Sequence, residues 1–446
     1  MRRLSLLVLL AVLVAGAAVA TADAAAVTAE AGLGGLSRPG RWTPVRVSID
    51  AANASISGEI IVEWGSARAR RTITLSAGSR KLVEMYIRTP DVRETIVVRL
   101  VSEGRDLAAV EVPIRLARPE EVFTLCVAAD AWPASRECST TQATAHLPRS
   151  WRGYDAVDDV VWPSSAVPLE REQQTALTQW QAIHRLEESG HSPAAAALQT
   201  SSVLGASARR ALAGVVFYLL AIAAAGLAFT RMRARSLTLY PAVGLLVVAG
   251  SAAALDAGRV GPGTGVRLQQ SVVAQQLPGT GSALILLRGV AEFPSFDAFE
   301  LRARGVDGVI EANLGSDRSL RYDEDGAPVM SSGTVGLGTR KSFRLEAVAA
   351  FQALTASAEG PIVRVSNQSS YGLDDCQFPA SFSKARIGSI APGQTVEAER
   401  TADDDGASFT CVLAAPIVEF SAAPIDVRSE GRTIVMLQLP QNGSGR

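Results

Sequence analysis

The stretch Thr43-Pro-Val-Arg-Val-Ser-Ile-Asp50 alternates apolar and polar residues, which places Val45, Val47 and Ile49 on one side. A two-residue period of this kind is typical of a β-strand with one buried face. Further strand-like runs follow at a spacing of about ten residues, separated by turn signals such as Asn53-Ala-Ser and Ser76-Ala-Gly. They are Ile60–Trp64, Thr72–Leu75, Lys81–Arg88, Glu94–Val101 and Ala108–Leu116. The pattern predicts an immunoglobulin-like β-sandwich over residues 25–118.

The residues before this sandwich are typical of an exported protein. A basic start, Met1-Arg-Arg3, precedes the apolar run Leu4–Ala20 and a small-residue cleavage motif, Ala22-Asp-Ala24. We therefore expect a secretory signal peptide over residues 1–24. An uncleaved signal anchor is the alternative, and either one would export the segment that follows.

Residues 119–200 have a different pattern. Glu121–Ala129 is a continuous apolar run, as in strands that are buried on both faces, and Tyr154–Trp162 has the pattern of a second strand. A helix is expected after Pro168, because apolar residues recur at three- and four-residue spacings. Its apolar face would contain Leu169, Ala176, Leu177, Trp180 and Ile183. Two strands and a helix predict a truncated α/β segment.

Two apolar runs, 211–230 and 237–255, have about the length that crosses a bilayer as a helix. The turn between them, residues 231–236, contains Arg231, Arg233 and Arg235, and clustered arginines stay on the cytoplasmic side. We therefore predict a two-pass protein of the bacterial inner membrane, with the lipid bilayer as a partner and both large regions exported. The expected fold class is a multidomain membrane protein with a β-sandwich, an α/β segment, a transmembrane helical hairpin and a C-terminal β-sandwich region.

The C-terminal region, residues 256–446, is again rich in strand patterns. The clearest are Ala283–Leu287, Ala298–Arg304, Ser342–Val348, Ile362–Val365, Ser408–Val412 and Thr433–Leu439. The Pro392-Gly393 step predicts a tight turn, because glycine takes positive φ without strain. We expect one or two sandwich units, joined near Ala349–Gly360.

Three motifs connect the chain to a known family. Gly40–Val47 reads Gly-x-Trp-x-Pro-Val-x-Val, Tyr154–Val161 reads Tyr-Asp-x-Val-Asp-x-Val-Val, and Leu169–Trp180 reads Leu-x4-Gln-x-Ala-Leu-x2-Trp. With the apolar hairpin after them, they resemble bacterial exported membrane proteins with an Ig-like domain and a degenerate glutamine-amidotransferase-like domain. The resemblance implies a middle domain without the amidotransferase nucleophile, genes beside a MoxR-type AAA+ ATPase, and a poorly defined function. The family's Gly-Gly turn after Trp180 is missing here, which predicts a shortened middle domain.

The chain has four cysteines, one pair before the apolar hairpin and one pair after it. Even pairs are expected where disulfides form and persist. We predict the bridges Cys126–Cys138 and Cys376–Cys411. Neither pair has CxxC spacing or histidines nearby, so a metal or redox role is not favoured.

Other chemical motifs are weak. His184, Glu187, Glu188 and His191 have helical spacing for a metal, but Ser189-Gly190 ends the helix before the second histidine. Gly333–Gly338 resembles a phosphate-binding loop whose lysine, Lys341, comes too late. The acidic runs Asp323–Gly326 and Asp403–Gly406 are favoured as hairpin turns over calcium loops.

The charge balance, 43 Lys and Arg against 44 Asp and Glu, gives no global field that would attract nucleic acid. No cofactor motif and no catalytic constellation is found in the sequence. The favoured hypothesis is therefore a non-catalytic envelope protein whose exported regions bind other membrane or envelope proteins, including an AAA+ ATPase-associated complex. An envelope enzyme with a site in residues 126–191 and an envelope ligand sensor are the alternatives.

Overall fold

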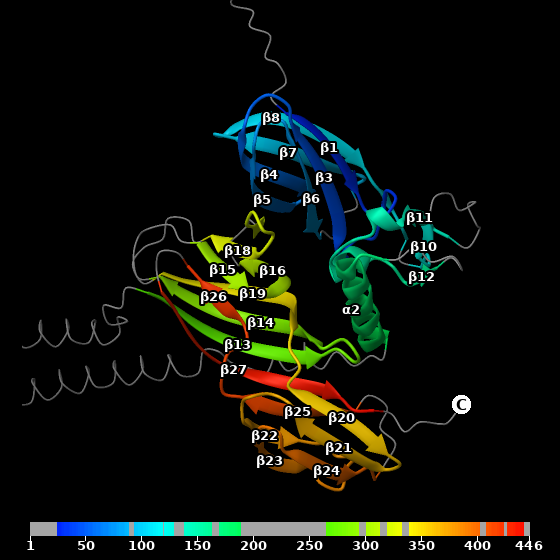
Figure 1. The fold of residues 1–446 in the computed structure, drawn as a ribbon, viewed down its shortest axis with the longest axis vertical. Coiled ribbons are helices and arrows are strands. Elements are labelled where there is room, and N and C mark those ends of the chain that lie inside the picture. Colours follow the sequence, from blue (N-terminus) through cyan, green and yellow to red (C-terminus); the bar gives the residue numbers. More distant parts are fainter. Residues whose placement is uncertain are drawn as a thin grey trace, which may run out of the picture. The chain divides into compact units, whose positions relative to one another are not determined.

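The computed structural model describes residues 25–88, 93–118, 120–128, 138–162, 169–188, 265–293, 300–312, 319–331, 339–401, 407–422 and 426–440. These residues form mostly β-strands (Figure 1). The chain divides into two compact units, Met1–Leu147 with Arg152–Val167, and Pro148–Trp151 with Pro168–Arg446.

The first unit contains a β-sandwich made of antiparallel sheets. One sheet has the order β1-β3-β6, and in the other β5, β4, β7 and β8 are neighbours in that order. The strands are β1 (Ala26–Ala31), β3 (Thr43–Ala51), β4 (Ile56–Trp64), β5 (Ala67–Leu75), β6 (Ser79–Ile87), β7 (Thr95–Ser102) and β8 (Arg105–Pro113). The alternation in β3 has the expected effect, since Val45, Val47 and Ile49 are fully buried. Each strand predicted between residues 43 and 116 overlaps one of β3 to β8.

A small parallel sheet completes the first unit. Its order is β11-β10-β12, with β10 (Thr124–Ala128) between β11 (Thr140–Ala143) and β12 (Asp159–Val161). The long strand predicted over Tyr154–Trp162 is wrong at its beginning, because Trp151–Tyr154 is a 3-10 helix, η2. The N–H of Val157 donates to the carbonyl of Tyr154 and continues the turn, so only the end of the run extends.

The second unit begins with a larger sandwich. Its first sheet has the neighbour order β16-β19-β14-β13-β27 and its second has β26-β15-β18-β17. The strands are β13 (Val266–Gln276), β14 (Ser282–Phe293), β15 (Glu300–Arg304), β16 (Val306–Ala312), β17 (Ser319–Tyr322), β18 (Pro328–Ser331), β19 (Thr339–Ala350), β26 (Glu419–Ser421) and β27 (Val427–Gln438). Side chains from both sheets form one apolar core. The first and last strands, β13 and β27, pair in parallel (Figure 1).

A second sandwich is inserted into the first. It combines the sheet β20-β21-β24 with β25, β22, β23 and the C-terminal half of β27, which pairs with β25. The strands are β20 (Leu354–Glu359), β21 (Ile362–Asn367), β22 (Leu373–Gln377), β23 (Arg386–Ile390), β24 (Thr395–Glu399) and β25 (Ser408–Leu413). The chain enters after β19 and leaves before β26, and Phe351 and Ile417 pack against both cores at these crossings.

The end of β21 is organised by one fully buried side chain, Asn367. Its Nδ2 donates to the carbonyls of Tyr371 at 2.8 Å and Ile390 at 3.1 Å, and its Oδ1 accepts the N–H of Ser369. The N–H of Gly393, a residue at φ +73°, donates to the main-chain carbonyl of Asn367. The asparagine therefore locks the Pro392-Gly393 turn to the strand, as a buried amide with satisfied hydrogen bonds can.

The membrane component of the predicted fold class is wrong for the residues that the structure describes. Within them, no helix is long and apolar enough to cross a bilayer. Their α-helix, α2 (Arg171–Glu188), has one buried face with Ala176, Leu177, Trp180 and Ile183, while Glu172, Gln174 and Thr178 are exposed. A helix with one apolar face suits packing against protein. The described residues therefore form a mostly β structure, and the prediction of a multidomain membrane protein is corrected.

Several predictions fall on residues outside the described ranges. They are the signal peptide 1–24, the spans 211–230 and 237–255, and the turn with Arg231, Arg233 and Arg235. Because the structure contains no helix of the required kind in its described part, the localisation as a two-pass inner-membrane protein is corrected as well.

Candidate functional site

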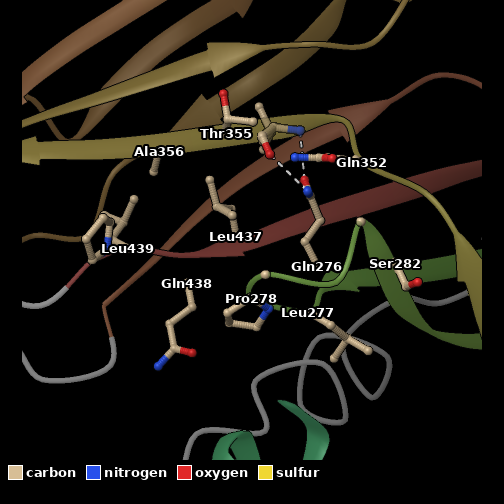
Figure 2. Close-up of a pocket in the computed structure, with 14 residues that line it drawn as sticks. Gln276, Leu277, Pro278, Ser282, Gln352, Thr355, Ala356, Leu437, Gln438 and Leu439 are labelled. Carbon is tan, nitrogen blue, oxygen red and sulfur yellow. Dashed lines mark hydrogen bonds between the residues drawn. The ribbon is translucent and has the colours of Figure 1, made fainter. Parts of the chain in front are cut away.

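A groove of about 620 Å³ lies in the second unit, at the open side of the second sandwich (Figure 2). Three pieces of chain form it: the turn between β13 and β14, the beginning of β20, and the end of β27. Fourteen residues line it, namely Gln276, Leu277, Pro278, Gly279, Gly281, Ser282, Gln352, Leu354, Thr355, Ala356, Leu437, Gln438, Leu439 and Pro440.

The groove exists because β13 ends before β27 does. The two strands pair up to Gln275 and Met436, and β13 then turns into β14 through Gly279 and Gly281, both at positive φ. The N–H of Leu277 donates to the carbonyl of Ser282 and closes this turn. On the side that β13 has left, Leu437 has no strand neighbour among the described strands.

The opposite wall is β20, which lies at the end of its sheet and pairs with β21. On the side away from β21, the main chain of its first residue, Leu354, is hydrogen-bonded to a side chain and not to a neighbouring strand. The Nε2 of Gln276 donates to the carbonyl of Leu354 at 2.9 Å, and the N–H of Leu354 donates to Oε1 of Gln276 at 2.8 Å (Figure 2). The buried amide therefore occupies the position that a peptide group of a neighbouring strand would take.

The direction of the remaining main-chain groups of β20 follows from this bond. In an antiparallel pair, successive residues direct their N–H and C=O groups alternately to one side and the other. Since those of Leu354 point away from β21, those of Ala356 and Ala358 do too. No described strand pairs with β20 on that side. The edge thus offers donors and acceptors next to the groove.

The lining has no charged side chain among its fourteen residues. Leu277, Pro278, Leu437 and Leu439 supply apolar surface, and the glutamines supply amides. The hydroxyl of Ser282 accepts a hydrogen bond from Gln179 of α2 at 3.3 Å. These fourteen residues include no general acid or base that would activate the hydroxyls of Ser282 and Thr355, but they can hold apolar and amide groups.

The structure forms both disulfides that were expected from the sequence. Cys126 of β10 is bonded to Cys138, and Cys376 of β22 to Cys411 of β25. The second bridge ties two neighbouring strands inside the core of the second sandwich. Since a nucleophilic cysteine must be a free thiolate, Cys126 is not one in this bonded state.

The metal-like histidine motif is only partly within the described residues. His184 stacks on Trp180, with ring centroids 5.4 Å apart, and Glu187 is exposed. His191 and the side chain of Glu188 lie outside the described part. Within that part, no three potential ligands come together for a metal ion.

The first acidic run is a hairpin turn between β17 and β18. Oδ1 of Asp323 accepts the N–H of Ala327 at 2.8 Å, and Oδ2 lies 2.9 Å from Nε of Arg302. Its oxygens are therefore committed to the turn and to an arginine. Gly333–Gly338 and Asp403–Asp405 lie outside the described residues.

Two of the three motifs that carry the family resemblance, Gly40–Val47 and Tyr154–Val161, lie close together in the first unit. Both oxygens of Asp158 accept from the guanidinium of Arg38, at 2.8 and 2.9 Å. Asp155 accepts the main-chain N–H of Trp42 at 2.8 Å and pairs with Arg41 at 3.2 Å. A partly buried bidentate pair of this kind holds chain segments in a defined geometry. These bonds therefore join the segment from Arg38 to Trp42 in the sandwich to the segment that leads into β12 of the parallel sheet.

Tyr154 lies in the same region and is almost fully buried. Burial raises the pKa of its phenol, the charge of Glu84 raises it further, and Arg46 opposes the rise. The phenol therefore stays neutral well above its ordinary titration range, as a structural group does.

Sequence reasoning did not identify the groove. One signal was present: Leu354-Thr-Ala-Ser-Ala358 is a strand without charge, which is unusual for the edge of a sheet. The sequence alone does not tell whether such a strand lies at an edge or in the middle.

One of the comparisons with known proteins matches the β-sandwich of the first unit. A family model described as a domain of unknown function, DUF8726, matches residues 24–115, which is less than half of the chain. A search of curated proteins finds no match. Among solved structures, the chain is similar to the yeast delta-COP-I mu-homology domain complexed with a Dsl1 WxWxV peptide. The identity is 12%, the TM-score is 0.23, and the match covers 41% of this chain and 100% of that chain.

A similarity with so low a TM-score supports no conclusion about this chain. The resemblance to exported proteins beside MoxR-type ATPases stays a prediction, since none of these matches bears on it.

Proposed function

We propose that this chain is a non-catalytic binding protein that holds a partner protein in the groove between β20 and the end of β27. The observation that carries the proposal is the edge strand β20, which borders this groove and carries no charge over residues 354–358. An edge strand is a template for association unless charges, proline or a covering segment block it. The two disulfides support a location in an oxidising compartment, where such bonds persist.

The chemistry of the lining supports binding over catalysis. Apolar walls with a few amides fix the position of a bound segment by burying its surface and bonding its polar groups. The burial of a single leucine-sized side chain contributes about 1.5 to 3 kcal/mol. The exposed parts of Leu437 and of the turn around Pro278 offer such surface.

Photo-crosslinking of the full chain in the cells that produce it tests the proposal. A photoreactive residue replaces Gln438, which lines the groove, and in a control it replaces Leu107, which is exposed on β8. We expect a discrete protein adduct from position 438 alone, and its loss when Leu437→Asp is added. Equal adducts from both positions, or none from 438, would contradict the proposal.

A further inference from the structure

We propose that the bound partner is an extended, uncharged segment of another polypeptide, which adds to β20 as a further strand in the register set by Gln276. This inference rests on the proposed function and names the partner class of the same groove. Strand addition joins main-chain hydrogen bonds, which give affinity, with side-chain pockets, which give specificity.

The first step is the amide of Gln276. Its two hydrogen bonds to Leu354 reproduce one rung of an antiparallel ladder, so the edge is already paired with an amide at its first position. The next outward rungs are those of Ala356 and Ala358. An added strand therefore begins beside Gln276 and runs along these two residues, which limits the main-chain contact to about five residues at the spacing of a strand.

The second step is the chemistry of the walls. Alternate side chains of an added strand would point toward Leu437 at the end of β27 and Leu439 just after it. A charged side chain there would lose water without gaining a partner, at a cost of several kcal/mol. The segment beside Ala356 should therefore be free of Asp, Glu, Lys and Arg.

The third step is a comparison with other edges of the described sheets. Those of β8, β16 and β24 each carry two carboxylates, namely Asp106 and Glu111, Asp307 and Glu311, and Glu397 and Glu399. The edge strands β11 and β23 carry none, but neither of them borders this groove. Charges on an edge strand oppose the approach of another strand. In β20 the first charge is Glu359, at the last residue.

The groove also argues for a peptide segment over a second copy of this chain. β20 forms one wall of the groove, and the β13–β14 turn and the residues Leu437–Pro440 form the others (Figure 2). In a second copy the same strand is flanked by the same residues, so two such edges approach each other less easily than one edge and a single extended segment.

The test uses the full, oxidised chain and random nonapeptides displayed on phage. The most enriched peptide is synthesised with blocked ends, and its affinity is measured by fluorescence anisotropy. Two further versions carry N-methyl groups on the odd or on the even residues. Because a strand bonds through alternate N–H groups, we expect one version to bind about tenfold more weakly and the other to bind as before.

A matched pair of variants locates the strand. Ala356→Pro removes an outward N–H of β20 without breaking its ladder to β21, as proline does on the open side of an edge strand. Ala109→Pro makes the same change on β8, in phase with the natural Pro113. We expect the first to weaken peptide binding about tenfold and the second to leave it unchanged.

The outcomes separate this inference from the proposed function. If both N-methylated peptides bind as well as the parent, strand addition is wrong, while a crosslink from position 438 would still support partner binding. If no peptide is enriched, or if Ala356→Pro instead abolishes a dimer of the chain, the inference is overturned. The N-methyl comparison uses the unchanged chain, so it holds even where a proline variant fails to fold.

Discussion

The edge strands β8, in the first unit, and β20, in the second, differ in how far their side chains protect the exposed main chain from another strand. β8 carries Arg105, Asp106 and Glu111 and ends at Pro113, whereas β20 is neutral until Glu359. Both expose main-chain groups that could pair with another strand. Charge and proline protect an edge from association, so β8 is closed to partners and β20 is open. In our proposal, this difference determines which edge holds the partner.

The largest expected effect comes from removing the support of the open edge. Phe409 is fully buried and its ring lies 4.6 Å from that of Phe378. Phe409→Ala should destabilise the second sandwich by about 3 to 5 kcal/mol, because it leaves a cavity. Hydrogen exchange read by mass spectrometry should then rise over residues 354–440.

Leu107→Ala is the matched control on β8, where the side chain is 38% exposed. It should change the stability of the first unit by less than about 0.5 kcal/mol. If hydrogen exchange over residues 354–440 stays unchanged in Phe409→Ala, the core of the second sandwich does not stabilise β20. The comparison of β20 with β8 would then lack its structural basis.

A smaller effect is expected from the amide at the beginning of the open edge. Gln276→Ala leaves the buried N–H and carbonyl of Leu354 without their partner, at a cost of about 1 to 3 kcal/mol. Gln352, which lines the same groove but is exposed, gives the control Gln352→Ala, with little effect. Urea unfolding measures the stability of both variants, and hydrogen exchange of the peptides that cover β20 shows whether the change is local. Equal stabilities of Gln276→Ala and the wild type would show that the Gln276 amide does not stabilise β20.

The two units should also differ at alkaline pH. Burial raises the pKa of Tyr154 above its ordinary 10.0, so the unfolded state loses this proton first as the pH rises. Above pH 10 the folded state then binds more protons, and the stability of the first unit should fall by about 1.4 kcal/mol per pH unit. Tyr154→Phe should remove this dependence in unfolding experiments between pH 9 and about pH 11. A wild-type slope that persists in the variant would assign it to another group.

The smallest expected effect tests the protection of β8. Asp106→Ala, Glu111→Ala and Pro113→Thr together remove the features that close this edge. We expect weak, concentration-dependent self-association in sedimentation velocity, because a neutral edge becomes available for pairing. The control Glu300→Ala with Glu430→Ala removes exposed carboxylates from the second unit. Association of the control to the same extent would point to net charge rather than to the edge.

Periodic patterns in the sequence predicted much of the strand content. The alternation in Thr43–Asp50 and the apolar face of Arg171–Glu188 are local, and local periodicity survives folding. The region Tyr154–Trp162 was less predictable, because Asp155 and Asp158 bond to Arg41 and Arg38, far away in the chain. Those tertiary bonds favour a turn where the sequence pattern favours a strand.

The sequence by itself determined where many of the strands form, which cysteines could pair, and that residues 354–358 carry no charge. Only the tertiary structure decided that β20 lies at an edge, that the pairing of β13 with β27 stops at Met436, and that Gln276 reaches Leu354 across 78 residues of chain. The physical reason is that strand order is a property of long-range pairing. A pattern of period two shows which face of a strand is buried, but not which neighbour, or whether any neighbour, lies beside it.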